Sequence, residues 1–225
     1  MEVKRRTIKS YVLRQGRLTR GQQQALDQLW PVYGIDFKAE RLDFDTLFNR
    51  PAAIILEVGF GNGDSLVQQA ASNPQNNYLG IEVHRPGVGR LLHLAGNAGI
   101  TNIRVINHDA VEVLQLQIPD QSLDRVQLFF PDPWHKKRHH KRRIVKAEFI
   151  RLIHQKLKPG GQFHLATDWQ DYAEHMLAEM EQAKGFSNTS GKGNYAENTD
   201  RPLTKFEQRG QRLGHGIWDL IYRKD

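Results

Sequence analysis

Ile54-Ile55-Leu56-Glu57-Val58-Gly59-Phe60-Gly61-Asn62-Gly63 is the stretch that sets the fold of this 225-residue chain. Its first half, residues 54–58, is short, apolar and β-branched, which is typical of a buried parallel strand. The glycines that follow allow a tight turn and a close approach of the backbone to a ligand. Residues 65–71 then have a helical pattern. A strand, a glycine turn and a helix in this order predict a nucleotide-binding βα unit.

The glycine turn differs from the dinucleotide fingerprint at one position. The pattern G-x-G-x-x-G would require glycine at position 64, where this chain has Asp64. A pyrophosphate over the helix N-terminus would meet that extra carboxylate, so NAD and FAD are disfavoured. Glu57, at the end of the strand, instead suggests a ligand with a cationic portion.

Further strand patterns follow along the chain, with helix patterns between them. They lie at residues 78–82, 103–106, 126–130 and 163–166. This alternation predicts an α/β fold with a doubly wound, mostly parallel sheet, whose ligands bind at the carboxyl ends of the strands. Residues 216–222 alternate like a last strand, which we expect to be antiparallel and to close the sheet.

An acidic residue stands at the end of each parallel strand pattern: Glu57, Glu82, Asp109, Asp132 and Asp168. Glu82 follows the glycine turn at the distance where an acid accepts hydrogen bonds from ribose hydroxyls. Asp109 has two open roles, because it can reach the adenine edge of a nucleoside or simply cap the helix that follows. The acids together predict a nucleoside site at one edge of the sheet.

Positive charge is concentrated in two segments of a chain whose formal net charge is +7. Residues 1–20 hold seven Lys and Arg against a single acid, and residues 135–146 hold seven with no acid. Two basic segments on an otherwise acidic body indicate a phosphate-backbone partner. We expect residues 1–24 to be a basic arm that is flexible without RNA, and residues 25–225 to be a single domain.

Other residue types narrow the range of functions. The absence of cysteine excludes disulfides and thiolate metal sites, and it fits a cytoplasmic protein. No apolar run approaches the ~18 residues of a membrane span, so no membrane association is expected. His135, His139 and His140 stand among lysines and arginines that would repel a cation, so no metal is expected.

The segment after the fourth strand pattern is the most distinctive in the chain. Phe-Phe-Pro-Asp-Pro-Trp-His-Lys-Lys-Arg-His occupies residues 129–139. Together with Thr167-Asp168, with Thr204-Lys205-Phe206-Glu207 and with residues 14–19, it resembles the bacterial tRNA (guanine-N7-)-methyltransferase family. The glycine turn, Glu82 and Pro159-Gly160-Gly161 are similar to class I S-adenosylmethionine-dependent methyltransferases in general. The resemblance covers nearly the whole chain.

The resemblance implies a Rossmann-like, seven-stranded sheet with the last strand antiparallel. It also implies transfer of a methyl group from S-adenosyl-L-methionine to N7 of guanosine 46 in the tRNA variable loop. The positions that would contact the cofactor are Glu57, Gly59, Gly61, Gly63, Glu82, Asp109 and Asp132. Asp132 would also be the catalytic residue. The positions that would bind the substrate nucleotide are Lys136, Asp168, Thr204, Lys205, Phe206 and Glu207. Those that would meet RNA are Arg138, His139, His140, Lys141, Arg142 and Arg143.

The chemistry of guanine N7 agrees with this set of residues. N7 carries a lone pair and loses no proton on methylation, so the site needs no general base. It needs in-line positioning and a carboxylate that stabilises the migrating positive charge, and we expect Asp132 to orient the base or screen that charge. Two roles stay open for Trp134, which can stack on the base or pack the turn.

Two rival functions also stay open from the sequence. The turn Pro131-Asp132-Pro133-Trp134 resembles the Asn-Pro-Pro-Tyr turn of amino-methyltransferases that act on adenine or glutamine. The aspartate and the basic run nevertheless favour guanine as the target. The second rival is a non-catalytic RNA-binding subunit, which degraded cofactor positions would signal, and none is degraded here. The expected partner is tRNA, with no obligate protein partner, and both a monomer and a homodimer are compatible.

Overall fold

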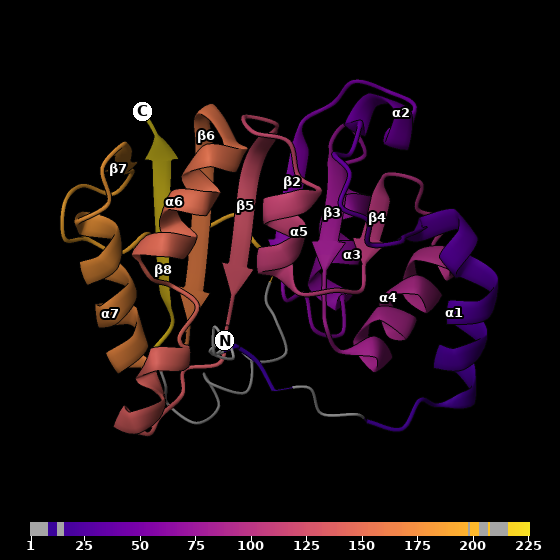
Figure 1. The fold of residues 1–225 in the computed structure, drawn as a ribbon, viewed down its shortest axis with the longest axis horizontal. Helices are drawn as coiled ribbons and strands as arrows, with labels where there is room; N and C mark the ends of the chain where they lie inside the picture. The colour runs from indigo at the N-terminus through magenta and orange to yellow at the C-terminus, as the bar shows by residue number, and fades with distance from the viewer. Residues whose placement is uncertain (1–8, 13–15, 198, 203–206, 208–215) are drawn as a thin grey trace, which may run out of the picture.

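The computed structural model describes residues 9–12, 16–197, 199–202, 207 and 216–225. Within these residues one sheet has eight strands in the order β1-β4-β3-β2-β5-β6-β8-β7 (Figure 1). Neighbouring strands from β1 to β6 are parallel, whereas β8 is antiparallel to both β6 and β7. The predicted α/β fold with a mostly parallel sheet and an antiparallel last strand is confirmed.

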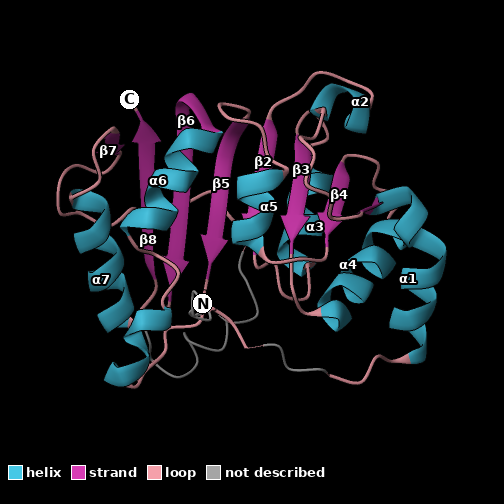
Figure 2. Ribbon diagram, in the orientation of Figure 1, coloured by secondary structure: helices cyan, strands magenta, loops and turns pink. Residues whose placement is uncertain are grey.

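Helices alternate with the strands along the chain, as Figure 2 shows. The strands are β1 (Gly34–Ile35), β2 (Ile54–Val58), β3 (Asn77–Ile81), β4 (Ile103–Ile106), β5 (Leu123–Phe129), β6 (Leu157–Thr167), β7 (Phe186–Asn188) and β8 (Trp218–Lys224). The α-helices are α1 (Arg20–Tyr33), α2 (Phe44–Phe48), α3 (Asp64–Ser72), α4 (Arg85–Asn97), α5 (Ala110–Leu116), α6 (Ala147–Lys156) and α7 (Gln170–Glu181). A 3-10 helix, η1, spans Lys137–Arg142.

The sheet differs from the expectation in two details. Seven strands were expected and eight are present among the described residues, and the short strands β1 and β7, of two and three residues, left no pattern in the sequence. The last strand, β8, does not close the sheet, because it lies between β6 and β7. A strand's position in the chain therefore did not reveal its position in the sheet.

The first helix, α1, begins before residue 25, where the domain was expected to start. Thr19 and Gln22 form a capping box that starts α1 at Arg20, within the segment expected to be an arm. Pro31 lies in the last turn of the helix and has no N–H, so the Asp27 carbonyl lacks its usual helical donor. Ala25 and Leu26 of this helix are buried, so α1 belongs to the packed domain.

Two apolar cores hold helices on opposite faces of the sheet. The larger core joins the sheet to α2, α5, α6 and α7 through residues such as Leu56, Val126 and Phe149. The smaller core joins β2, β3 and β4 to α1, α3 and α4, for example through Ile55 and Leu91. Neighbouring strand residues such as Ile55 and Leu56 enter different cores because side chains alternate across a sheet.

The parallel strands end along one edge of the molecule, the lower edge in Figure 1. The glycine turn follows β2 there, and the Pro-Asp-Pro-Trp turn follows β5. No helix of the described residues is long and apolar enough to cross a membrane. The fold thus gathers the loops that carry the predicted acids at a single edge.

Candidate active site at the carboxyl ends of the strands

A cavity of about 230 Å³ opens at the carboxyl ends of β2, β3, β4 and β5. Gly59, Glu82, Asp109 and Asp132, which are four of the predicted cofactor positions, line it. Their convergence is what the parallel topology predicts, because the ends of adjacent strands lie side by side.

A larger hollow of about 580 Å³ lies at the opposite ends of the strands. It is lined by residues that precede or begin β2, β3, β5 and β6, such as Ala53, Asp124 and Lys158. None of the predicted site residues that the structure describes lines it. We therefore take the smaller cavity as the candidate active site, since ligands of such sheets bind at the carboxyl ends.

The glycine turn fixes the carboxylate of Glu82. The Gly61 N–H donates to Glu82 Oε2 over 2.8 Å, and the His84 N–H donates to Glu82 Oε1 over 2.8 Å. Gly63 sits behind the turn with a φ of +76°, and a Cβ there would lie 2.6 Å from Leu91 Cβ. Gly61 thus orients an acid, whereas Gly63 allows α3 and α4 to approach.

Glu57 is a buried acid without a complete set of partners. Its residue is 3% exposed, and its Oε2 has no hydrogen-bond partner among the described residues. Burial, and secondly the negative charge of Glu82, raises the pKa of Glu57 to about 8. Glu57 does not line the cavity itself. A buried carboxyl group with no partner on Oε2 would ionise if a ligand brought a positive charge near it.

Asp109 makes the helix-capping bond that was one of its two open roles. Its Oδ1 accepts from the Val111 N–H over 3.0 Å at the start of α5. The Tyr11 hydroxyl donates to its Oδ2 over 3.2 Å, and Lys9 Nζ lies 3.5 Å from that oxygen. Asp109 also lines the cavity, so capping does not withdraw it from a ligand.

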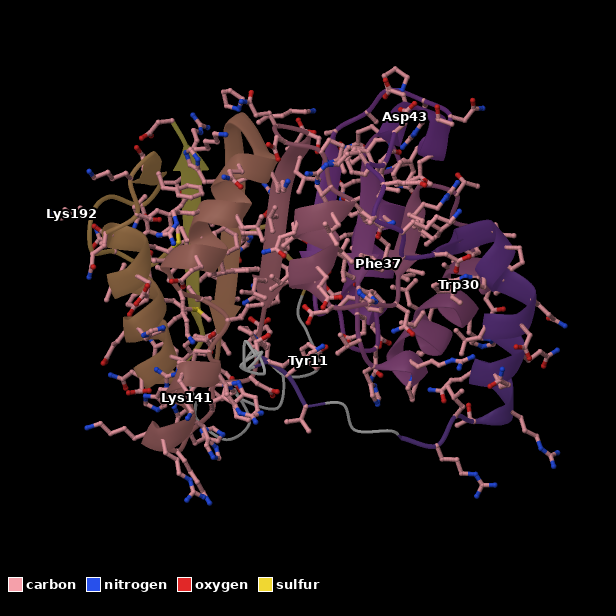
Figure 3. All side chains as sticks on the ribbon, viewed as in Figure 1. Tyr11, Trp30, Phe37, Asp43, Lys141 and Lys192 are labelled. Carbon is pink, nitrogen blue, oxygen red and sulfur yellow. The ribbon has the colours of Figure 1, made fainter. Side chains whose placement is uncertain are left out.

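The segment at residues 9–12 contributes to the cavity, a feature that the sequence did not predict. Ser10 and Tyr11 line it, and the Ser10 carbonyl accepts from the Trp134 indole N–H over 3.2 Å. Figure 3 shows Tyr11 at the edge where the parallel strands end. One segment thereby contacts both the Asp109 side and the Trp134 side of the cavity. A single tyrosine in a basic segment carries no pattern that would have identified it.

The Pro-Asp-Pro-Trp turn is held by a buried arginine. Phe130 and Trp134 have φ values of 50° and 51°, so the chain bends sharply on both sides of Asp132. The Arg143 Nε donates to the Pro133 carbonyl over 3.0 Å. Asp132 itself is exposed at the cavity wall. The turn thus presents one carboxylate from a rigid support.

The predicted RNA-binding positions differ in accessibility. Arg138 and Lys141 are exposed on η1, whereas the Arg143 side chain is buried, paired with Asp171 and packed 4.8 Å over the Tyr172 ring. Burial and then the nearby cations lower the pKa of His139, which keeps it neutral at pH 7. The Arg142 guanidinium lies 4.7 Å from the centre of the Trp134 ring, so η1 packs against this indole.

A basic groove adjoins the cavity. It has a volume of about 410 Å³, and its cations come from both basic segments of the chain. They are Lys9, Lys141, Arg142, Arg143 and Lys146. Ser10, Asp109 and Ile144 line both the groove and the cavity, so the two spaces lie next to each other.

The predicted substrate positions are only partly described. Lys136 is exposed before η1, and Asp168 is half-buried at the end of β6. Glu207 is buried and paired with Arg201. Thr204, Lys205 and Phe206 lie outside the described residues. The described part of the chain contains no group of three acidic or histidine side chains that could hold a metal ion.

Comparison with known proteins identifies the family. A family model described as "Putative methyltransferase" matches residues 51–220. A tRNA (guanine-N(7)-)-methyltransferase of Hydrogenovibrio crunogenus is 60% identical over 98% of this chain and 92% of its own length. One from Yersinia enterocolitica is 62% identical over 97% of this chain and 92% of its own length. The chain belongs to the tRNA (guanine-N(7)-)-methyltransferase family.

Solved structures of other methyltransferases have a similar fold. The crystal structure of the 16S rRNA methyltransferase KamB superposes with a TM-score of 0.60 and 16% identity. The match covers 83% of this chain and 95% of KamB. At so low an identity the likeness concerns the arrangement of the sheet and helices alone. Family membership confirms the resemblance that the motif at residues 129–139 indicated.

Proposed function

We propose that this protein transfers a methyl group from S-adenosyl-L-methionine to N7 of a guanosine in tRNA, giving 7-methylguanosine and S-adenosylhomocysteine. The observation that carries the proposal is one cavity lined by Glu82, Asp109 and Asp132 and adjoined by a basic groove. Membership of the tRNA (guanine-N(7)-)-methyltransferase family supports it. The target within tRNA is position 46 of the variable loop.

The residues around the glycine turn fit the cofactor. Glu82 is held by two backbone N–H groups, which leaves its carboxylate oriented to accept from ribose hydroxyls. Asp109 reaches the adenine edge, and the unpartnered Glu57 favours the cationic portion. When bound, S-adenosylmethionine supplies an electrophilic methyl group. These residues bind and orient, and none of them has to accept a proton.

In this proposal Asp132 stabilises the positive charge that develops on the guanine. The methylated purine gains a positive charge, and a carboxylate at the cavity wall stabilises it as it develops. The rigid turn around Asp132, fastened through Pro133 to Arg143, keeps that carboxylate in place before the reaction. Preorganisation of this kind lowers the barrier without further rearrangement.

The groove cations supply the affinity for RNA. A guanosine in folded tRNA must be splayed out of its stack, which costs a few kcal/mol. Contacts of Lys141, Arg142 and Lys146 with phosphates offset that cost. The cytoplasm is where this protein meets its substrate, because tRNA is there. The exposed positions on η1, not the buried Arg143, are the ones we assign to RNA.

The test is incubation of the protein with labelled cofactor and bulk tRNA, followed by borohydride–aniline cleavage, which cuts the chain at 7-methylguanosine. We expect one labelled site in the variable loop, and loss of that label with Asp132→Ala. Label on an exocyclic amine would favour the amino-methyltransferase alternative. RNA binding without any label would favour a non-catalytic subunit.

A further inference from the structure

The half of the sheet made by β5, β6 and β8 carries buried polar side chains on the face opposite the larger core. Gln127 and His164 are register partners on β5 and β6, and Asp219 lies on β8 opposite Ala166. All three are buried. His164 Nε2 lies 2.7 Å from Asp219 Oδ1. Burial of a polar group is costly unless the group is paired. Asp219 supplies that partner to His164.

Arg201 completes the pair and extends it. Its Nε and Nη2 donate to the two carboxylate oxygens of Asp219 over 2.7 and 2.8 Å. Its Nη2 also lies 3.2 Å from Glu207 Oε1, and its Nη1 pairs with Glu207 Oε2. The Arg201 side chain is 3% exposed. A guanidinium that is forked onto two carboxylates has a fixed orientation, because its donors are planar and rigid.

The same guanidinium touches the start of the catalytic turn. Its carbon lies 5.7 Å from the Phe129 ring centre and 5.3 Å from that of Phe130. Both residues line the cavity, and the chain bends at Phe130, just before Pro131 and Asp132. Arg201 therefore contacts the strand end, the last strand and Glu207 at once.

The charges on Arg201 and Asp219 keep the two side chains paired at neutral pH. Burial alone would raise the pKa of Asp219, but hydrogen bonds and charges from Arg201 and His164 outweigh it and lower this pKa. Asp219 is thus ionised at neutral pH and holds Arg201 as a charged partner. A clamp that stays ionised can fix Glu207 relative to Phe130 throughout the reaction.

We propose that Arg201 is a positioning residue for methyl transfer, which acts by holding Glu207 against the turn that carries Asp132. The inference rests on the proposed function, in which Glu207 belongs to the substrate-binding positions. It assigns to Arg201 a role in placing the guanine and none in binding the cofactor. Asp219 accepts hydrogen bonds from Arg201, and His164 lies within hydrogen-bond distance of Asp219.

The test compares Arg201→Lys, which keeps the charge and loses the fork, with the wild-type protein. We expect the single-turnover rate of methyl transfer to tRNA to fall about 100-fold, the scale of a small misplacement of reacting groups. Affinity for S-adenosylmethionine and for tRNA, measured by calorimetry and filter binding, should change less than about threefold, because cofactor acids and phosphate contacts are elsewhere. Arg125→Lys, on the same face beside Asp200, is the matched control and should keep the full rate.

A double-mutant cycle separates positioning from a merely structural role. If Arg201 acts through Glu207, Arg201→Lys combined with Glu207→Gln should be no slower than Glu207→Gln alone. Losses that multiply, an unchanged rate for Arg201→Lys, or an equal loss of cofactor affinity would each overturn the proposal. Wild-type protein that forms no 7-methylguanosine would instead overturn the proposed function.

Discussion

Glu57 and Asp219 are both buried on the same face of the sheet, on β2 and β8, with β5 and β6 between them. Burial should raise the pKa of either carboxyl. It does so for Glu57, whose pKa rises to about 8, whereas Arg201 and His164 lower that of Asp219. Burial thus sets the cost of a charge, and the partners decide whether the charge is present. The ionised acid belongs to the scaffold, whereas Glu57 stays neutral unless a positive charge comes near it.

Removal of Asp219 should produce the largest effect that this comparison predicts. Asp219→Ala leaves the Arg201 guanidinium buried with only part of its partners. We expect the free energy of unfolding to fall by about 3–5 kcal/mol, because Arg201 and His164 stay buried and both lose their acceptor on Asp219. Urea denaturation would measure it.

The control for that experiment is Asp200→Ala, which breaks the pair between Arg125 and an Asp200 side chain that is 72% exposed. That change should cost less than about 1 kcal/mol. Equal losses in the two variants would show that the buried acid contributes no more than a surface one, and the contrast between the two sites would collapse.

Replacing Glu57 should raise the stability of the protein at high pH, whereas replacing Asp219 should lower it. In the unfolded chain it ionises near its ordinary pKa of 4.5, whereas in the folded protein it stays protonated up to about pH 8. The folded state therefore binds the extra proton, and its stability falls as the pH rises from about 4.5 to 8. Glu57→Gln should remove this loss, making the variant roughly 2–4 kcal/mol more stable than wild type at pH 8 but not at pH 4.

Chemical denaturation of the cofactor-free protein across that pH range would measure the difference. Glu112→Gln, which changes an exposed acid on α5, provides the reference slope. Parallel pH profiles for wild type and Glu57→Gln would mean that Glu57 is ionised in the folded protein and has found a partner.

Lys141 should give the smallest effect, because its contribution is electrostatic and exposed. Lys141→Ala should weaken tRNA binding without base preference and reduce the slope of log affinity against log salt by about one. Lys192→Ala, in the loop after β7, is the matched control (Figure 3). Filter binding from low to moderate salt is the measurement, and an unchanged slope for Lys141→Ala would remove it from the RNA surface.

Sequence patterns predicted the parts of this site that depend on local structure. The glycine turn and the acids at strand ends followed from short motifs whose geometry is set within a few residues, as with Gly61 and Glu82. The basic run was also evident, but charge alone did not show that Arg143 turns inward to Asp171 while Lys141 faces out.

The parts that escaped prediction depend on contacts between distant segments. Tyr11 meets Asp109, and Arg201 meets Asp219 and Phe130, through folding of the whole chain. His164 resembles any polar residue in a strand until β8 is known to insert beside β6. Long-range pairing of this kind leaves no periodic signal in the sequence.

The segment at residues 9–12 has a consequence for the timing of the catalytic cycle. Tyr11 and Ser10 connect the Asp109 side of the cavity to the Trp134 side, and we expect this segment to move when spent cofactor is exchanged for fresh cofactor. The same segment continues the basic arm, so a tRNA that engages the arm would hold this segment in place. Turnover should therefore be ordered, with cofactor exchange after tRNA release. A chase of prebound labelled cofactor that is slower in the presence of tRNA would reveal this order, and an unchanged chase rate would contradict it.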